Sequence, residues 1–356
     1  MTAAAVEAAD RAEPGAHPAD AGVARTNARR AAGVVVLLAV LAGVMFASVL
    51  VGSQHIPLST VWDGIAHFDP LSVDHNSVRA RVSRTVLGVL VGLALGVSGA
   101  LIQAMTRNPL ADPGILGVNA GAAFFVALAV GLFGFTTIWT NIWFALLGAI
   151  LATSLVYLVG SRGVAGATPV RLTLAGVAVS ALLGGITVGL MLVDPVAFDQ
   201  MRFWSAGSIA GRPLDAPLAI APFLIVGVAL AAVVARSLNA VALGDDLARS
   251  LGADVVRTRV LGVVAVTLLC GAATAAAGPI GFVGLMIPHV CRWIVGPEQR
   301  WILLYTLVAA PILLLVADIL ARVVLERNEL PVGVVTAFVG APVLIALVRR
   351  SKASGL

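Results

Sequence analysis

Long, almost uninterrupted apolar runs recur along the chain and constrain its fold more than any other feature. A helix needs about 20 apolar residues to cross the hydrocarbon layer of a bilayer, and a window of about 19 residues finds such runs. Eight are clear, at residues 33–51, 85–105, 116–135, 141–160, 171–193, 214–237, 260–277 and 302–325. Two are weaker, at 282–295 and 332–348, because each contains a proline. We predict an all-α membrane protein with about ten spans.

The composition also indicates a chain that folds in lipid. Hydrophobic residues make up 60% of the 356 positions, charged residues make up 12%, and the mean hydropathy is +1.02. A soluble domain carries roughly a quarter charged residues, so one helical bundle in a membrane fits better than two or three soluble domains. Cys270 and Cys291 lie in apolar segments without the spacing of metal ligands, and we predict that both are core residues.

The basic residues predict how the chain is oriented. With the N-terminus inside, 16 of the 23 arginine and lysine residues fall in cytoplasmic segments and 7 fall outside. Because cytoplasmic loops carry the excess of basic residues, we expect a multi-pass protein of the plasma membrane with both termini in the cytoplasm. Residues 1–30 are rich in alanine and charge, and we predict a disordered cytoplasmic tail before a membrane domain at 31–350.

The chain contains two similar segments in opposite orientations. "RTVLGVLVGLALGVSGA" begins at Arg84 in the second span, and "TRVLGVVAVTLLCGAATA" begins at Thr258 in the seventh. Five spans separate them, so the second copy enters the bilayer from the other side, as in the inverted repeats of many transporters. Chance similarity is the alternative in so biased a sequence. Within the first copy, Gly88, Gly92 and Gly96 share one helix face, which favours tight helix packing.

The segment "TRNPLADPGILGVNAGA", residues 106–122, interrupts two apolar runs. Proline lacks an amide donor and disfavours helix at the preceding residue, so Asn108-Pro109 and Asp112-Pro113 break the helical hydrogen bonding. Such a break is tolerated at membrane depth only against protein or a water-filled cavity. A helix then restarts near Asn119. We predict that Asn108, Pro109 and Asn119 belong to a pathway; an ordinary interfacial turn is the alternative.

Three segments resemble one transporter family. "SGALIQAMTRNPLADPGILGVNAGA" from Ser98, "GPIGFVGLMIPHVCRW" from Gly278 and "ADILARVVLERNELPVGVVTAFVGAPVLIALV" from Ala317 are similar to the FecCD-type permeases of ABC importers for iron-siderophores, haem and cobalamin. The resemblance extends from about residue 34 to residue 350. It implies a fold like the cobalamin-importer permease, with ten spans and a dimer of identical or homologous subunits around a central pathway.

The same resemblance implies the partners and the substrate class. Two ABC ATPase subunits bind such permeases inside, and an extracytoplasmic substrate-binding protein binds outside. A ferric siderophore is the expected substrate, with haem or cobalamin as the alternatives, and no nucleic-acid partner is expected. The permease itself is not an enzyme, so we predict no catalytic residue in this chain.

The energy source is expected to lie on a partner. The chain has no GxxxxGK[ST] phosphate loop, since its only lysine is Lys352, which alanine follows. ATP and Mg²⁺ therefore belong to a separate ATPase, and we predict no cofactor here. An ion-coupled secondary carrier is the alternative from another class, but among 18 acidic residues only Asp318 falls well inside a predicted span. Asp318 and Arg322 are also spaced for a structural i, i+4 ion pair.

A cytoplasmic segment between the sixth and seventh spans has the features of a docking helix. "LNAVALGDDLARSLGAD", residues 238–254, contains a Gly-Asp-Asp helix start, two leucines four residues apart and a glycine stop. Its spacing resembles the ATPase-coupling motif of ABC import permeases, with a leucine in place of one alanine. A solvated connector is the alternative. The predicted coupling residues are Asp245, Asp246, Leu247, Ala248, Arg249, Leu251 and Gly252.

The outer arginines are few and grouped. Arg81 and Arg84 lie at the mouth of the second span and Arg322 lies near the outer end of the ninth. The resemblance implies that these positions receive acidic side chains of the binding protein. Anchoring at the membrane interface is the alternative.

The inner turn "GATPVR", residues 166–171, resembles the family segment that narrows the pathway, which assigns a gate role to Thr168 and Pro169. A plain loop is the alternative. His289 is a lone histidine beside Pro288, so we expect a packed or hydrogen-bonded side chain, and we predict no metal site.

Overall fold

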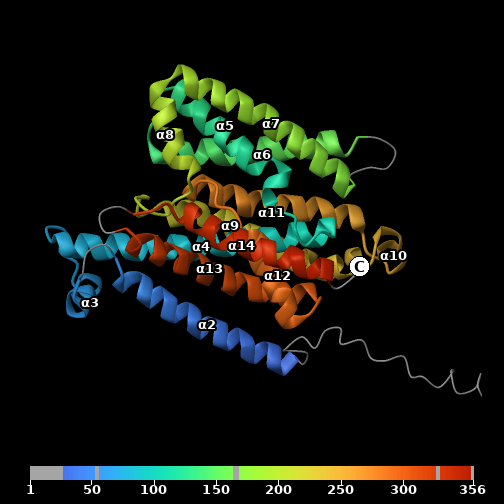
Figure 1. The fold of residues 1–356 in the computed structure, drawn as a ribbon, viewed down its shortest axis with the longest axis horizontal. Coiled ribbons are helices and arrows are strands. Elements are labelled where there is room, and N and C mark those ends of the chain that lie inside the picture. Colours follow the sequence, from blue (N-terminus) through green and yellow to red (C-terminus); the bar gives the residue numbers. More distant parts are fainter. Residues whose placement is uncertain (1–26, 53–55, 163–167, 326–328, 354–356) are drawn as a thin grey trace, which may run out of the picture.

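The computed structural model describes residues 27–52, 56–162, 168–325 and 329–353, and every regular element in these ranges is a helix (Figure 1). The first half contains α2 (Asn27–Leu50), α3 (Leu58–Ala66), α4 (Val73–Thr106), the 3₁₀ helix η1 (Pro113–Leu116), α5 (Val118–Gly131), α6 (Ile138–Gly160) and α7 (Pro169–Val193). After α8 (Pro195–Ser205) come α9 (Ala216–Ala242), α10 (Asp245–Ser250), α11 (Val255–Ala277), α12 (Val283–Val295), α13 (Gln299–Val323) and α14 (Val332–Ala353).

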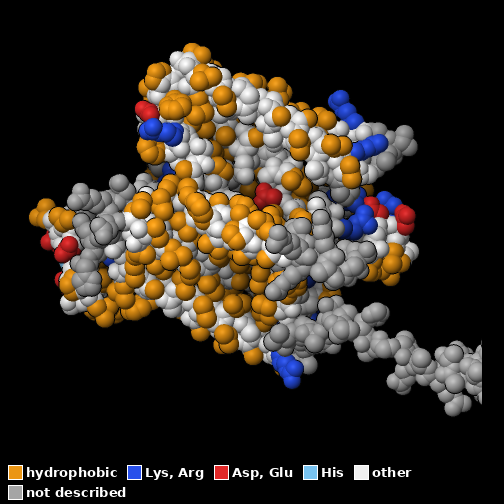
Figure 2. Space-filling model, in the orientation of Figure 1, with side chains coloured by type: hydrophobic (Ala, Val, Ile, Leu, Met, Phe, Trp, Pro, Cys, Tyr) orange, Lys and Arg blue, Asp and Glu red, His pale blue; other side chains and the backbone are white. Residues whose placement is uncertain are grey.

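Each of the ten predicted spans corresponds to one helix, and the all-α fold is confirmed. Seven of these helices have the length and apolar composition of membrane spans, and three shorter apolar helices, α5, α12 and α14, account for the rest. Orange apolar side chains cover the middle of the visible face, and most charged side chains lie toward its two ends (Figure 2). We name these ends after α3 and α10, which lie at opposite ends of the bundle (Figure 1).

The predicted boundaries need three corrections. Residues 27–30, assigned above to the tail, form the first turn of α2; residues 1–26 lie outside the described residues. Two short helices, α3 and α8, were not predicted because neither is long enough to give an apolar run of membrane length. The helix α3 is amphipathic and lies at the end of the bundle. Val61 packs into the bundle, whereas Leu58, Trp62 and Ile65 form an apolar face that stays exposed.

The order of the helices repeats. A long helix, a short helix, a long buried helix, a break and a short apolar helix follow one another from α2 to α5 and again from α9 to α12. Two long helices, α6 and α7, and the short α8 complete the first copy, and α13 and α14 complete the second. The central helices α4 and α11 run in opposite directions between the two ends (Figure 1). This order confirms the inverted repeat that the sequence predicted.

Glycines set the closest contacts of α4. A Cβ atom at Gly88 would lie 2.6 Å from the Leu315 side chain, and one at Gly92 would lie 2.6 Å from the Pro311 backbone. A Cβ at Gly96 would overlap Ala310, so all three predicted glycines face α13. Absence of side chains lets the two backbones approach, and the predicted packing face is confirmed.

The break after α4 has the form that its prolines and aspartate predict. Arg107 ends the helix in the left-handed conformation, and Asp112 Oδ1 accepts a hydrogen bond from Gly114 N at 2.8 Å. The Ile115 amide donates to Asp112 O at 3.1 Å, which closes the turn. Gly117, with φ at 76°, then joins η1 to α5. These local bonds satisfy backbone groups that the prolines remove from the helical pattern.

Candidate coupling, docking and pathway sites

The helix α10 presents apolar side chains outward from one end of the bundle. Gly244 precedes it with φ at 112°, a conformation that favours glycine, and Gly252 follows with φ at 80°. Within α10, Ala248 is fully buried against the bundle. Leu247, and Leu251 directly after the helix, are 50% and 62% exposed. The helix thus offers two leucines from a base that is fixed on the bundle.

Ion pairs attach α10 to the two central helices. Asp245 lies 2.9 Å from Arg259 of α11 and 3.6 Å from Arg107 at the end of α4. Asp246 and Arg249 pair with each other at 3.0 Å on the exposed side. The helix α10 is therefore bonded directly to α11 and to the end of α4.

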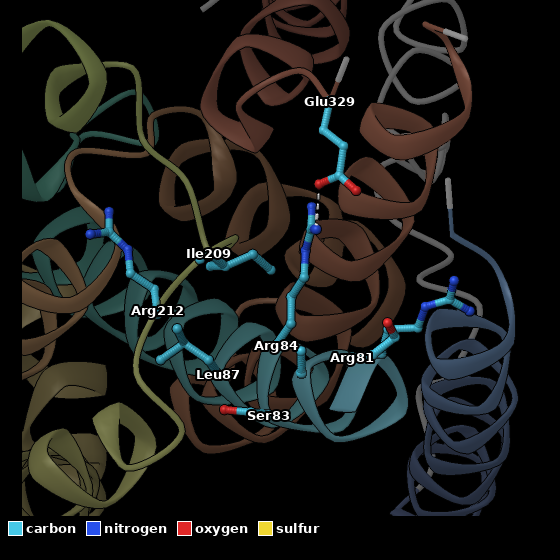
Figure 3. A pocket seen from close by; sticks show the side chains of 10 residues that line it. Arg81, Ser83, Arg84, Leu87, Ile209, Arg212 and Glu329 are labelled. Carbon is cyan, nitrogen blue, oxygen red and sulfur yellow. Dashed lines mark hydrogen bonds and ion pairs between the residues drawn. The ribbon is translucent and has the colours of Figure 1, made fainter. Parts of the chain in front are cut away.

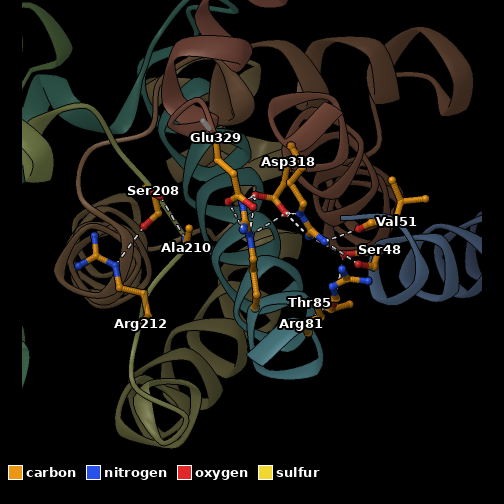
Figure 4. A network of polar contacts seen from close by, with 11 residues as sticks. Ser48, Val51, Arg81, Thr85, Ser208, Ala210, Arg212, Asp318 and Glu329 are labelled. Carbon is orange, nitrogen blue, oxygen red and sulfur yellow. Dashed lines mark hydrogen bonds and ion pairs between the residues drawn. The ribbon is translucent and has the colours of Figure 1, made fainter. Parts of the chain in front are cut away.

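A buried carboxylate joins three helices at the α3 end. Asp318 of α13 accepts hydrogen bonds from the Arg84 guanidinium of α4, at 2.8 to 3.1 Å, and from Arg322 one turn along its own helix. Arg322 also donates to the Ser48 and Val51 carbonyl oxygens of the α2 segment, at 2.6 and 2.9 Å (Figure 4). The structural ion pair between Asp318 and Arg322, offered above as an alternative, is present.

The predicted docking arginines all have partners within the chain. Arg81 donates to the Leu50 carbonyl oxygen at 2.9 Å, and Arg84 also pairs with Glu329 at 2.6 Å. The Arg322 side chain is 1% exposed, so a direct contact with another protein would require it to leave these bonds. Arg81, Arg84 and Glu329 instead line a cavity of about 210 Å³ at this end (Figure 3).

The predicted pathway residues do not form one group. Asn108 and Pro109 are exposed in the turn after α4, where Asn108 Oδ1 accepts a hydrogen bond from Leu110 N. Asn119, in the first turn of α5, accepts a hydrogen bond from Thr274 of α11 at 2.9 Å. Asn119 therefore joins the two halves of the repeat, whereas Asn108 stabilises a surface turn.

Thr168 and Pro169 begin α7. The Thr168 carbonyl oxygen accepts the Leu172 amide at 3.0 Å, and Pro169 takes the first helical position, where no amide donor is needed. Residues 166 and 167, the first two of the predicted turn, lie outside the described residues.

Both cysteines lie in the packed interior, and His289 is partly buried. Cys270 and Cys291 are buried and unpaired, as predicted for core residues. The His289 ring packs edge-on against Trp293 with ring centres 4.8 Å apart. In the described ranges, no three His, Cys, Asp or Glu side chains gather as a metal site.

With the geometry established, similarity to known proteins identifies the class. The profile of the FecCD transport family matches residues 37–350. The chain belongs to the FecCD transport family. FecCD membership confirms the resemblance drawn from the three sequence motifs, and it places the chain among the permeases of ABC importers for iron-siderophores, haem and cobalamin.

FecCD relatives with different printed substrates match this chain. The ferric enterobactin transport system permease FepD of Escherichia coli (strain K12) is 47% identical over 334 residues, which cover 94% of this chain and 98% of FepD. The hemin transport permease HmuU of Yersinia pestis is 32% identical over 90% of this chain and 95% of its own. The cobalamin import permease BtuC of Halobacterium salinarum is 37% identical over 78% and 74%.

Similarity to a solved structure confirms the architecture. A metal-chelate type ABC transporter in an inward-facing conformation superimposes with a TM-score of 0.78 at 27% identity, covering 90% of this chain and 99% of that one. Family and fold both favour an ABC permease over the ion-coupled carrier considered above.

Three residues of the site were missed by sequence. Ser48, Glu329 and Arg212 make or line the polar contacts of the α3 end; Glu329 lies in a motif quoted above but was given no role there, and Ser48 and Arg212 lie in none. Ser48 bonds to Arg322 and Glu329 bonds to Arg84, and in each pair the partner lies more than 200 residues away along the chain. Neighbouring residues in the sequence therefore give no sign of these bonds. Arg212 stands alone between Gly211 and Pro213, and an isolated arginine between turn residues is the one signal that could have singled it out.

Proposed function

We propose that this chain is the membrane-spanning subunit of an ATP-driven importer and that its substrate is a ferric siderophore. The observation that carries the proposal is the 47% identity to the ferric enterobactin permease over nearly the full length of both chains. The haem and cobalamin permeases match at lower identity, and they supply the alternative substrates. No covalent chemistry on the substrate is part of this function.

The α10 end is the cytoplasmic end in this proposal, and two separate ABC ATPase subunits dock there on the permease dimer. Exposed Leu247 and Leu251 fit an apolar groove on a partner, and the ion pairs of Asp245 transmit its movement to α4 and α11. ATP binding and hydrolysis on the partner bias the outward- and inward-facing states, because the permease has no nucleotide site of its own. Both chain termini then lie in the cytoplasm, since α2 begins and α14 ends toward the α10 end of the bundle (Figure 1).

The α3 end faces the substrate-binding protein in this proposal. Arg81 and Arg84 line the cavity that opens there, and acidic side chains of the partner would meet them (Figure 3). Arg322 contributes indirectly, because through Asp318 it fixes the position of the Arg84 guanidinium. Thr168 and Pro169 narrow the pathway at the opposite end, where two copies of the chain approach each other.

Uptake in a deletion strain tests the substrate. A strain without this gene, complemented with the full transporter, receives radiolabelled ferric tris-catecholate siderophore, haem or cobalamin. We expect complementation to restore uptake of the ferric siderophore and not of the other two. Restored uptake of haem or cobalamin alone would contradict the siderophore assignment and keep the ABC permease, whereas uptake independent of any ATPase would contradict the class.

A further inference from the structure

A cavity of about 360 Å³ lies between the two halves of the repeat at the α3 end. It is lined by residues of α5, α6, α8, α11 and the two loops before α9 and α14. Polar side chains predominate in one part of the wall, where Asn141, Gln200, Ser208 and Arg212 lie, and the rings of Phe203 and Trp204 form another. The volume accommodates one arm of a metal chelate rather than a whole chelate.

Arg212 is a cation in the wall of this cavity, and no carboxylate of the described residues pairs with it. Its Nε atom donates to the Ser208 carbonyl oxygen at 3.1 Å, and in the described part of the chain its two terminal nitrogens have no hydrogen bond or ion pair (Figure 4). Burial lowers the pKa of the Arg212 guanidinium to about 10, so the group is still a cation at neutral pH. An arginine held in this way presents two donors to an incoming anion.

The neighbouring carboxylate does not neutralise Arg212. Glu329 lines the same cavity, but its oxygen lies 2.6 Å from Arg84, which points toward it and away from Arg212 (Figure 3). The 210 Å³ cavity described above shares Arg212 and Glu329, and Arg81 and Arg84 also line it. The side chains around the two cavities thus comprise three arginines and one glutamate, an excess of positive charge.

Asn141 supplies a second, independent sign of a ligand. The residue is 7% exposed and lines the larger cavity, and its Oδ1 atom is buried without a hydrogen-bond partner among the described residues. A buried polar atom without a partner costs free energy of about 1 to 3 kcal/mol. The atom is closed to solvent in this structure, so a rotation of the Asn141 side chain would bring it to a ligand N–H or O–H group in the cavity.

The loop that carries Arg212 is held in place. Ser208 N donates to Ala277 O at 2.7 Å, Gly333 N donates to Gly207 O at 3.0 Å, and Ala210 N donates to the Ser208 hydroxyl at 3.1 Å. The loop is therefore bonded to the end of α11 and the start of α14, and the guanidinium is positioned before any ligand arrives.

We propose that Arg212 and Asn141 form a binding site for one anionic arm of the transported chelate. Arg212 donates to the negatively charged oxygens of that arm, such as a catecholate or carboxylate, and Asn141 accepts a hydrogen bond from an adjacent N–H or O–H. The site selects chelates with net negative charge over neutral ones. This inference rests on the proposed import of a ferric chelate and adds the charge of the substrate to it.

Direct binding to the assembled transporter tests the site. The permease with its ATPase subunits is placed in lipid nanodiscs without the binding protein and titrated with ⁵⁵Fe-labelled tris-catecholate chelate, which is anionic, or with a neutral tris-hydroxamate chelate. We expect Arg212→Gln to weaken binding of the anionic chelate about tenfold or more, and binding of the neutral chelate less than about twofold. Arg212→Lys should recover part of the loss because it keeps the charge without the planar fork.

Two further variants keep the test decisive. Arg79→Gln removes an exposed arginine of the same end, stacked on Phe68 and outside both cavities, and should leave both affinities unchanged. Asn141→Asp places a negative charge in the cavity and should weaken the anionic chelate selectively. If Arg212→Gln does not fold, the Asn141→Asp variant tests the binding site in its place. Equal effects on both chelates, wild-type affinity in the Arg212 and Asn141 variants, or binding of the neutral chelate alone would overturn the site.

The two proposals fail differently. If the wild-type transporter neither binds nor imports any ferric chelate, the proposed substrate class is wrong and the site falls with it. If it imports ferric chelates but Arg212→Gln behaves like Arg79→Gln, only the Arg212 site is wrong.

Discussion

Asp318 is buried between the guanidinium groups of Arg84 and Arg322. These ion pairs join α4 to α13, and the hydrogen bonds from Arg322 to the α2 segment join α2 to both. Removing one partner of a buried ion pair leaves an uncompensated charge, which typically costs about 3 to 5 kcal/mol. We therefore expect Asp318→Ala to lower stability by about that amount, because both Arg84 and Arg322 lose their shared partner. Thermal unfolding of the purified permease in detergent measures the change.

Glu329→Ala is the matched control, since it removes the partly exposed carboxylate of Arg84 and leaves Asp318 in place. Its effect should be under about 1 kcal/mol, as for exposed ion pairs. A similar small effect for both variants would show that the buried network contributes little. The same assay separates two roles of Arg322. If the residue is structural, its substitution lowers the unfolding temperature; if it only docks the binding protein, its substitution changes the affinity for that protein and not the unfolding temperature.

At the level of the helix, close backbone contact fixes how α4 crosses α12. A Cβ atom at Gly99 would overlap the Gly284 carbonyl oxygen, and backbone cannot move aside as a flexible side chain can. We expect Gly99→Ala to destabilise the permease by about 1 to 3 kcal/mol, the usual cost of overpacking. Gly43→Ala on α2, where no atom lies within 4 Å of the added group, is the control and should be neutral or slightly stabilising. Equal unfolding temperatures would contradict this packing.

The exposed leucines of α10 give the prediction for coupling. Leu247→Asp or Leu251→Asp should leave the permease folded, because both side chains are at least half exposed, but should detach or uncouple its ATPase. Co-purification of the ATPase and substrate-stimulated ATP hydrolysis in membranes measure the effect. Leu58→Asp, with a similarly exposed leucine on α3 at the other end, should keep the ATPase bound. Normal coupling in the α10 variants would refute the assignment.

Helices that a local sequence pattern marks, such as an apolar run or a start and stop motif, could be predicted from the sequence, and the others could not. The ten spans follow from apolar runs, two of them weakened by a proline, and α10 follows from its glycines and aspartates. In contrast, α3 and α8 are short and take their place from packing. The partners of Arg84 were also out of reach, because Asp318 lies 234 residues along the chain and only the fold brings the two side chains together. Arg81, Arg84 and Arg322 could be grouped by sequence, and the i, i+4 pair of Arg322 with Asp318 could be offered as an alternative, but the bonding of Arg81 and Arg84 could not be foreseen.

For the whole molecule, the outward faces of α7 and α14 are apolar surfaces that the chain itself leaves exposed. Only 17% of the apolar window of α7 is buried within the chain, and Phe338 of α14 is 77% exposed. In a membrane protein such a surface faces either lipid or a second subunit. Family membership supplies the reason to propose a permease dimer with the start of α7 near its axis.

Disulfide cross-linking between copies tests that assembly and its gate together. Thr168→Cys places a thiol at the start of α7, and we expect it to cross-link the dimer with a yield that changes when the ATPase binds ATP, because the inner gate opens and closes with nucleotide state. The native Cys270 and Cys291 are buried, so the unmodified chain should give no cross-link and serves as the control. A cysteine in place of Leu58, at the opposite end, should not respond in the same direction. A yield at position 168 that is indifferent to ATP would place the gate elsewhere, and no cross-link in any state would remove Thr168 from the dimer axis.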